Sequence, residues 1–121
     1  MFDGESRPWG HFYVILSEEF YKVKRLVVAP GQRTSMQRHS KRAEHWTVVN
    51  GSGHAWSYDP GGDTVGKEIG MSDAIAITTG SWHRVGNDSE DEDLVIIEVQ
   101  LGFCEEGDIE RREDDYGRLD K

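Results

Sequence analysis

Short runs of β-branched and aromatic residues, each ended by glycine, proline or asparagine, follow one another along almost the whole chain. The first two runs are His11–Leu16 and Tyr21–Ala29, and the second stops at Pro30-Gly31. Valine, isoleucine and aromatic residues favour strands, whereas glycine and proline mark turns. The later runs are Glu44–Asn50, Gly53–Tyr58, Ala74–Thr79, Trp82–Val85 and Leu94–Leu101. Short strands at this spacing predict an all-β antiparallel sandwich or barrel.

Turn-forming residues separate these runs. Gly51-Ser52-Gly53 predicts a hairpin between two runs, and the sequence Asp-Pro-Gly-Gly-Asp at 59–63 predicts the next turn. Arg7-Pro8-Trp9-Gly10 is expected to open the ordered region with a turn. For residues 105–116 two alternatives are open, a short charged helix or a path along the surface.

The length of 121 residues fits one domain, which we divide into a barrel at about 7–103 and an acidic tail at about 104–121. No run approaches the ~18 consecutive apolar residues of a membrane span, and Met1–Glu5 lacks the pattern of a signal peptide. A cytoplasmic protein is therefore expected.

The formal net charge is −9, and it is unevenly distributed. Residues 88–121 carry 14 acidic against 4 basic residues, whereas residues 1–87 carry 9 against 10. Nucleic acids and anionic membranes are bound by basic surfaces, so neither is expected as a partner. A locally cationic site remains compatible with the first 87 residues.

The single cysteine, Cys104, excludes an internal disulfide and a cysteine-based zinc motif. It is expected to behave as a small hydrophobic residue. Any metal site in this chain must therefore use histidine, carboxylate or amide ligands.

Four side chains of these types occur at a spacing that brings them together. Residues i and i+2 of a strand share a face, so Gln37 and His39 can both point inward. Glu44 begins the next strand after a short turn, and His83 lies on a later strand. The four side chains predict a site for one divalent metal ion inside the barrel.

The same residues lie in two motifs. The first is Gly31-x5-Gln37-x-His39-x4-Glu44-x6-Gly51, and the second is Gly80-x2-His83-x3-Asn87. Together they resemble the two motifs of the cupin superfamily, which implies a double-stranded β-helix, or jelly-roll barrel, whose four ligands meet one metal. Gln37 stands where most cupins have a histidine, Thr78 where proline is usual, and Ser72 where glycine is usual.

A closer resemblance extends from Arg7 to Arg118. Its segments are Arg7-Pro8-Trp9-Gly10, Tyr21–Leu26, Pro30-Gly31, Ser35–His39, Arg42–Trp46, His83-Arg84, Ile97–Gln100 and Asp115–Arg118. They look like the type II phosphomannose isomerase cupin, a domain often fused behind a mannose-1-phosphate guanylyltransferase domain and expected to stand alone here. Ser40-Lys41 replaces the family's histidine-rich run, and residues 102–108 depart from its tyrosine-containing acidic segment.

This resemblance implies a metal-dependent isomerase that converts mannose 6-phosphate to fructose 6-phosphate. It implies Lys24, Arg42 and Arg84 as substrate contacts, with Lys24 and Arg84 also in catalytic roles. Zinc is the expected ion, with manganese, iron, cobalt and nickel as alternatives. Cupins commonly pair, so a homodimer is expected as well.

Strand alternation adds further candidates. Glu98 and Gln100 share one face of an otherwise apolar strand, and if that face is inward, Glu98 is a candidate proton shuttle and Gln100 a substrate contact. Trp82, beside His83, is a candidate for stacking on a sugar ring. His45 should point away from the interior because it follows the ligand Glu44. The catalytic base stays unassigned.

Two other functions compete with the isomerase. Two histidines and one carboxylate form the facial ligand set of non-haem iron oxygenases, although Gln37 would crowd the position that oxygen needs. A non-catalytic cupin that binds a sugar phosphate or a sugar nucleotide is the other alternative, and the altered segment Ser40-Lys41 favours it.

Overall fold

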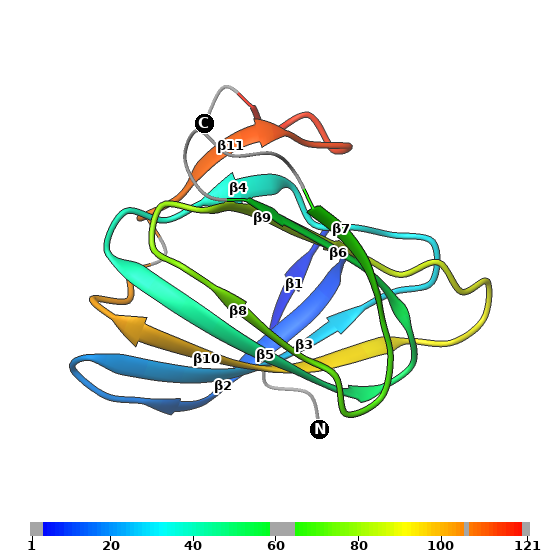
Figure 1. The fold of residues 1–121 in the computed structure, drawn as a ribbon, viewed down its shortest axis with the longest axis horizontal. Helices are drawn as coiled ribbons and strands as arrows, with labels where there is room; N and C mark the ends of the chain where they lie inside the picture. Colours follow the sequence, from blue (N-terminus) through cyan, green and yellow to red (C-terminus); the bar gives the residue numbers. More distant parts are fainter. Residues whose placement is uncertain (1–3, 59–64, 106, 120–121) are drawn as a thin grey trace.

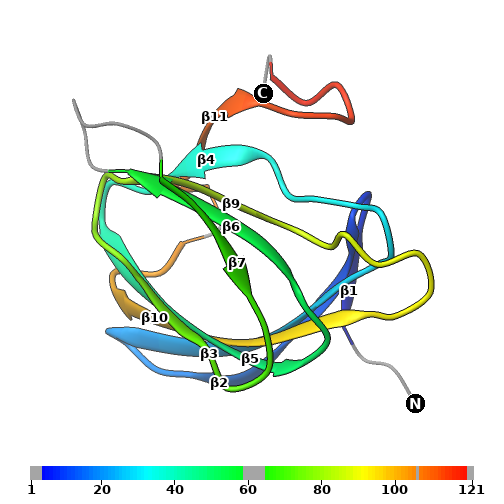
Figure 2. The same ribbon diagram turned by 45° about the vertical axis from the view of Figure 1, so that its right-hand side comes forward.

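Two antiparallel β-sheets face each other in the computed structural model, which describes residues 4–58, 65–105 and 107–119 (Figures 1 and 2). The larger sheet has the strand order β1-β2-β3-β10-β5-β8, and the smaller sheet has the order β11-β4-β9-β6-β7. The described residues contain no helix long and apolar enough to cross a membrane. The all-β class expected from the sequence is confirmed.

The bounds of the strands follow the runs seen in the sequence. The larger sheet contains β1 (Glu5–Arg7), β2 (Gly10–Ser17), β3 (Tyr21–Val28), β5 (Arg42–Asn50), β8 (Ala74–Ile77) and β10 (Leu94–Gly102). The smaller sheet contains β4 (Met36–Arg38), β6 (Gly53–Tyr58), β7 (Val65–Ile69), β9 (Trp82–Gly86) and β11 (Glu110–Glu113).

All seven predicted runs form strands, with small shifts at their ends, and β1, β4, β7 and β11 are additional. Gln37 lies on β4, as expected, whereas His39 follows the end of that strand at Arg38. The predicted turn at Arg7–Gly10 is shorter than expected, because Arg7 and Gly10 belong to strands. Residues 105–116, for which a helix or a surface path was open, contain β11, which pairs antiparallel with β4. The predicted turn at 59–63 lies outside the described residues.

The central strand of the larger sheet is β10, which pairs with β3 on one side and with β5 on the other. Its register places Glu98 opposite Lys24 on β3 and opposite Trp46 on β5. Gln100, two residues further, lies opposite Glu44. Because side chains at i and i+2 share a face, this register gathers the polar residues of three strands at one level of the barrel.

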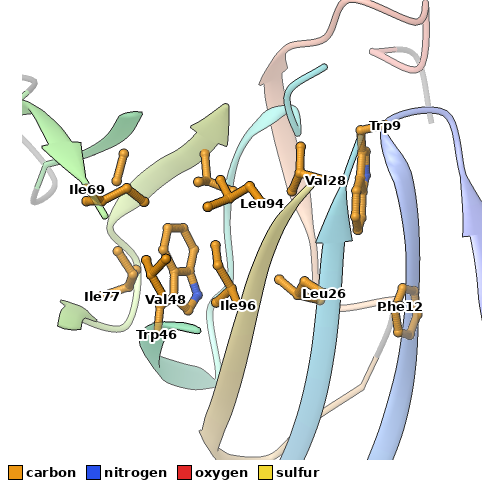
Figure 3. Packing of buried hydrophobic residues seen from close by; sticks show 12 residues of the cluster. Trp9, Phe12, Leu26, Val28, Trp46, Val48, Ile69, Ile77, Leu94 and Ile96 are labelled. Atoms are coloured by element: carbon orange, nitrogen blue, oxygen red, sulfur yellow. The ribbon is translucent and has the colours of Figure 1, made fainter. Parts of the chain in front are cut away.

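Apolar side chains fill the other part of the interior, and Figure 3 shows most of them as one continuous layer. Burying side chains of this size contributes roughly 1.5–3 kcal/mol each. On β10, buried Leu94 and Ile96 precede Glu98, and on β3, buried Val28 and Leu26 lead to Lys24. The cluster consists of Trp9, Phe12, Leu26, Val28, Trp46, Val48, Ala55, Ile69, Ile77, Val85, Leu94 and Ile96.

Two turn residues have left-handed backbone conformations. Gly51, between β5 and β6, has φ 81°, and a Cβ atom there would lie 2.4 Å from the carbonyl oxygen of Asp93. Only glycine fits that position. Ser72, which stands where cupins usually have glycine, has φ 73° and is the only described non-glycine residue with positive φ.

Candidate metal centre

Three of the predicted ligands come together in the polar half of the barrel. His39 follows β4, Glu44 lies on β5 and His83 lies on β9, and all three are buried. His39 Nε2 is 3.2 Å from Glu44 Oε2, and His83 Nε2 is 3.6 Å from Glu44 Oε1. Their ligand atoms all lie within 4.8 Å of one another. One ion can therefore reach all three.

The hydrogen bonds of the two imidazole rings fix which nitrogen is available. Nδ1 of His39 lies 2.7 Å from the carbonyl oxygen of Asp108, and Nδ1 of His83 lies 2.9 Å from that of Ser81. A carbonyl only accepts, so both Nδ1 atoms carry the proton and both Nε2 atoms present a lone pair. His83 Nε2 is buried without a hydrogen-bond partner.

Charge at this centre also suits a divalent cation. Burial raises the pKa of Glu44, but the hydrogen bond with His39 and the positive charges of His83 and His39 in their protonated forms, together with Arg42, outweigh burial and hold that pKa well below its usual value. When the two rings are neutral, Arg42 is the cation that remains beside Glu44, at 3.1 Å from its Oε2. Burial lowers the pKa of His83 and so favours its neutral form. One carboxylate and two neutral imidazoles are a donor set that divalent transition metals accept.

Gln37 reaches the same cavity from β4, and its Cα pairs with that of His83. Its Oε1 accepts a hydrogen bond of 2.8 Å from the hydroxyl of Ser35. The amide oxygen therefore has a fixed orientation beside the three ligands. A fourth ligand role for Gln37 stays a prediction.

Arg42 adds a cation directly beside the ligands. Its Nε donates to Glu44 Oε2 at 3.1 Å, and its Nη2 lies 3.2 Å from His39 Nε2. The third nitrogen, Nη1, donates to the carbonyl oxygen of Glu105 at 3.3 Å. The guanidinium is thus held in place from both the barrel and the tail.

A buried network connects Glu44 to Glu98. The indole nitrogen of Trp46 donates to Glu44 Oε1 at 3.0 Å and to Glu98 Oε2 at 3.2 Å, and Gln100 Nε2 donates to Glu98 Oε1 at 2.6 Å. Burial raises the pKa of Glu98 well above its usual value, and the charge of Glu44 raises it further. Glu98 is therefore the protonated partner of the pair.

The site opens into a cavity of about 130 Å³. Seven of the predicted site residues line it, namely Lys24, Gln37, His39, Arg42, His83, Glu98 and Gln100. Glu44 lies directly beside it, within contact of His39 and His83. His45 is exposed on the other face of β5, as strand alternation predicts.

Arg84 and Trp82 are not among the residues that line this cavity, and their roles in the site stay predictions. His83 points inward, so its two neighbours on β9 point to the opposite face. Arg84 there donates to the carbonyl oxygen of Thr34 and to Glu113 of the tail. Trp82 stacks against the guanidinium groups of Arg38 and Arg112, at 4.6 and 5.0 Å from its ring centroid.

Three cavity residues come from the acidic tail and were not predicted, namely Ile109, Arg111 and Arg118. Arg111 on β11 and Arg118 after it line the cavity together with Arg7 of β1. Alternation within a strand at 110–113 could have indicated Arg111, but no apolar pattern marks that strand in the sequence. Arg118 ends the last segment of the family resemblance, which gave it no role.

The facing sheets and the inward His, Glu and His side chains define a cupin. Solved structures share this fold at low sequence identity. The capsular polysaccharide assembling protein CapF from Staphylococcus aureus matches with a TM-score of 0.78 and 19% identity, over 91% of this chain and 34% of that one. Oxalate decarboxylase from Bacillus subtilis matches with a TM-score of 0.79 and 16% identity, over 89% and 29%.

Sequence comparison is more specific. The family model for the mannose-6-phosphate isomerase C-terminal domain matches residues 2–114, so the chain belongs to that family. It is 39% identical over 117 residues to the mannose-1-phosphate guanylyltransferase ManC of Salmonella typhimurium. It is 42% identical over 113 residues to the alginate biosynthesis protein AlgA of Pseudomonas aeruginosa. Each alignment covers 93% of the chain but only 22% of the relative, about a fifth of its length.

Proposed function

We propose that this chain is a metal-dependent isomerase that converts mannose 6-phosphate to fructose 6-phosphate. The observation that carries the proposal is the placement of Glu98, a buried carboxyl group, beside the centre formed by His39, Glu44 and His83. The family match and the relatives named for mannose-1-phosphate chemistry support a sugar phosphate as the ligand.

The reaction moves a proton between neighbouring carbons of the sugar, through an enediol-like species with developing negative charge on oxygen. A divalent ion bound by His39, Glu44 and His83, with Gln37 as the proposed fourth ligand, would supply Lewis-acid stabilisation of that charge. Zinc suits two imidazoles and a carboxylate, and manganese, iron, cobalt and nickel are the alternatives.

The chain's own residues take the remaining tasks. Glu98, whose carboxyl group is held by Gln100 and Trp46 in one orientation, gives its proton to a substrate oxygen as the enediol-like species forms and takes it back as that species collapses, while the base that moves the carbon-bound proton stays unassigned. Lys24, opposite Glu98 in the register, and Arg42 provide positive charge for the substrate's oxygens. Gln100 completes the polar wall. The same buried network keeps these groups fixed before the substrate arrives.

The decisive experiment is a coupled isomerase assay on mannose 6-phosphate, with elemental analysis of the same sample. Turnover should be abolished by a chelator and by His39→Ala, and it should be restored in the wild type by added metal. His45→Ala is the matched control, because His45 is an exposed histidine on β5, directly after Glu44 in the sequence. A metal-loaded, folded protein that converts no sugar phosphate would contradict the proposal.

A binding role without turnover is the second candidate, and the altered segment Ser40-Lys41, whose backbone N–H groups donate to Asp108, supports it. Saturable binding of mannose 6-phosphate with no product over long incubation would establish this role. Oxygen uptake by an iron-loaded, reduced sample would instead indicate the oxygenase alternative, which uses the same His39, Glu44 and His83.

A further inference from the structure

Three arginines from distant parts of the sequence line the same cavity as the metal centre. Arg7 comes from β1, Arg111 from β11 and Arg118 from the segment after β11. Among the described residues that line the cavity, Glu98 is the one carboxylate, against the five cationic side chains of Arg7, Lys24, Arg42, Arg111 and Arg118. This part of the cavity is therefore strongly cationic, although the tail that supplies two of the arginines is acidic overall.

The carboxylates near these arginines accept from only some of the guanidinium N–H groups, so other N–H groups of the arginines stay available to a ligand. Arg118 donates to Asp114 through Nε at 3.0 Å and Nη2 at 2.8 Å. Arg7 lies 3.5 Å from Glu5 at the exposed edge of the sheet. Arg111 has a buried Nε with no hydrogen-bond partner. A buried donor without a partner costs free energy unless a ligand satisfies it.

The arginines also repel one another. Burial lowers the pKa of Arg111, the charges of Arg118 and Arg7 lower it further, and the charge of Asp114 only partly opposes them. Guanidinium groups placed close together in a cavity suit a phosphate group, whose oxygens accept several charge-assisted hydrogen bonds at once.

Phe12 connects this cluster to the metal centre. The guanidinium of Arg7 lies 4.8 Å from the centroid of the Phe12 ring, and the ammonium of Lys24 lies 4.2 Å from the same centroid. Lys24 in turn lies opposite Glu98 in the register of β3 and β10. A single small ligand can therefore contact the arginines and the reacting groups within one cavity.

We propose that Arg7, Arg111 and Arg118 bind the phosphate group of the sugar phosphate. This inference rests on the proposed function for the identity of the sugar, but the anion site itself does not need turnover. It assigns a substrate-binding role to the tail. In this proposal the phosphate is bound by these three arginines rather than by Arg84, a substrate contact implied by the resemblance, which lies on the opposite face of β9.

The test is calorimetric titration of the full chain with mannose 6-phosphate, with inorganic phosphate and with unphosphorylated mannose. The protein is used both with chelator and with zinc, so that binding is measured apart from activity. Arg111→Gln should weaken the binding of mannose 6-phosphate and of phosphate by about tenfold or more, as expected for a lost hydrogen bond to a charged group. Any binding of mannose should be unchanged.

Arg112→Gln is the matched control. It removes the same charge from the same strand as Arg111→Gln, but from the outer face, where Arg112 stacks on Trp82. Its affinities should stay within about twofold of the wild type. Arg7→Gln tests the site from the other end of the chain, and it decides the matter if Arg111→Gln does not fold.

Wild-type affinity for phosphate in both Arg7→Gln and Arg111→Gln would overturn the inference, as would a wild-type chain that binds neither phosphate nor mannose 6-phosphate. The two proposals can fail separately. Phosphate binding that is lost in the variants, without any isomerisation by the wild type, removes the isomerase and keeps the phosphate site. Isomerisation by the wild type with a KM that Arg111→Gln leaves unchanged would keep the isomerase and remove the phosphate site.

Discussion

Two buried carboxyl groups, Glu44 and Glu98, share one donor, the indole nitrogen of Trp46. Their environments separate their pKa values, since burial and the charge of Glu44 raise that of Glu98, whereas partners around Glu44 hold its pKa down. Such a separation assigns different tasks to neighbouring carboxyl groups. Glu44 is suited to bind a cation and Glu98 to carry a proton.

Replacing Glu98 by glutamine should therefore affect chemistry more than structure. Glutamine keeps the size of the side chain, and its one carbonyl oxygen can accept from either Gln100 or Trp46. We expect Glu98→Gln to retain the metal content of the wild type and to lower kcat by about a hundredfold or more. Elemental analysis and the isomerase assay measure the two quantities. A variant with normal turnover would exclude Glu98 as the proton carrier.

The raised pKa of Glu98 also has a consequence for stability. The folded metal-free chain keeps a proton that the unfolded chain releases, so the free energy of unfolding should fall as pH rises above the ordinary glutamate pKa. This loss is complete once pH exceeds the raised value. Glu98→Gln has no proton to release at this position, so it lacks this loss of unfolding free energy and should be the more stable protein at neutral pH. Urea denaturation at several pH values, with exposed Glu68→Gln as control, measures the difference.

At the scale of elements, the turn before β8 carries a strained residue. Ser72 has φ 73°, a conformation that costs roughly 1–2 kcal/mol for residues with a Cβ atom. Its side chain is exposed, so little packing is lost on removal. Ser72→Gly should raise the free energy of unfolding by about 1 kcal/mol, or the midpoint of thermal unfolding by about 4 °C. Ser89→Gly is the control, and equal effects of both changes would contradict the explanation.

Two carboxylates of the tail have lowered pKa values. A hydrogen bond from Arg33 of the barrel lowers the pKa of Asp115, and one from Arg118, within the tail itself, lowers that of Asp114. A lowered pKa adds stability above the ordinary aspartate pKa, and this stability is lost as pH falls through the lowered value. The tail should therefore stay docked from neutral pH to about pH 4 and detach only below it.

Hydrogen exchange of the backbone amides of β11 is the measurement for this docking. Protection at 110–113 should be lost in acid before that of β10, because β11 is a four-residue edge strand whereas β10 pairs on both sides. Asp115→Asn, which removes the partner of Arg33, should produce the same loss at neutral pH, and Glu90→Gln, in an exposed loop, should not. Simultaneous exchange of β11 and β10 would show that the tail is part of the barrel's cooperative unit.

At the scale of the whole molecule, the sequence predicts the barrel and most of the centre, because both depend on strand alternation. His39, Glu44 and His83 were expected to meet, and they do. Strand alternation places Arg84 on the opposite face of its strand from His83, whereas the family resemblance implies Arg84 as a substrate contact. The tail could not be predicted, because β11 forms through pairing with β4 and through ion pairs rather than through apolar residues of its own.

The homodimer expected from the family resemblance would need an interface, and the β2 edge of the larger sheet has the features of one. The pairing of β2 with β1 ends at Phe12, so among the described residues β2 has no neighbouring strand on that side from Val14 onward. Ile15 is 55% exposed and Phe20, in the following turn, 63%. An unprotected strand edge with apolar side chains favours pairing with another chain.

Ile15→Lys should therefore shift the chain from dimer to monomer in light scattering after size exclusion, because a charge on this edge opposes pairing. Val49→Lys is the matched control, since Val49 is a similarly exposed apolar residue on β5, away from β2 in the strand order. Isomerase activity should persist in the monomer, because the groups proposed to act, His39, Glu44, His83 and Glu98, already meet within a single chain. A dimer that survives Ile15→Lys but dissociates with Val49→Lys would place the interface on the β5 side of the sheet instead.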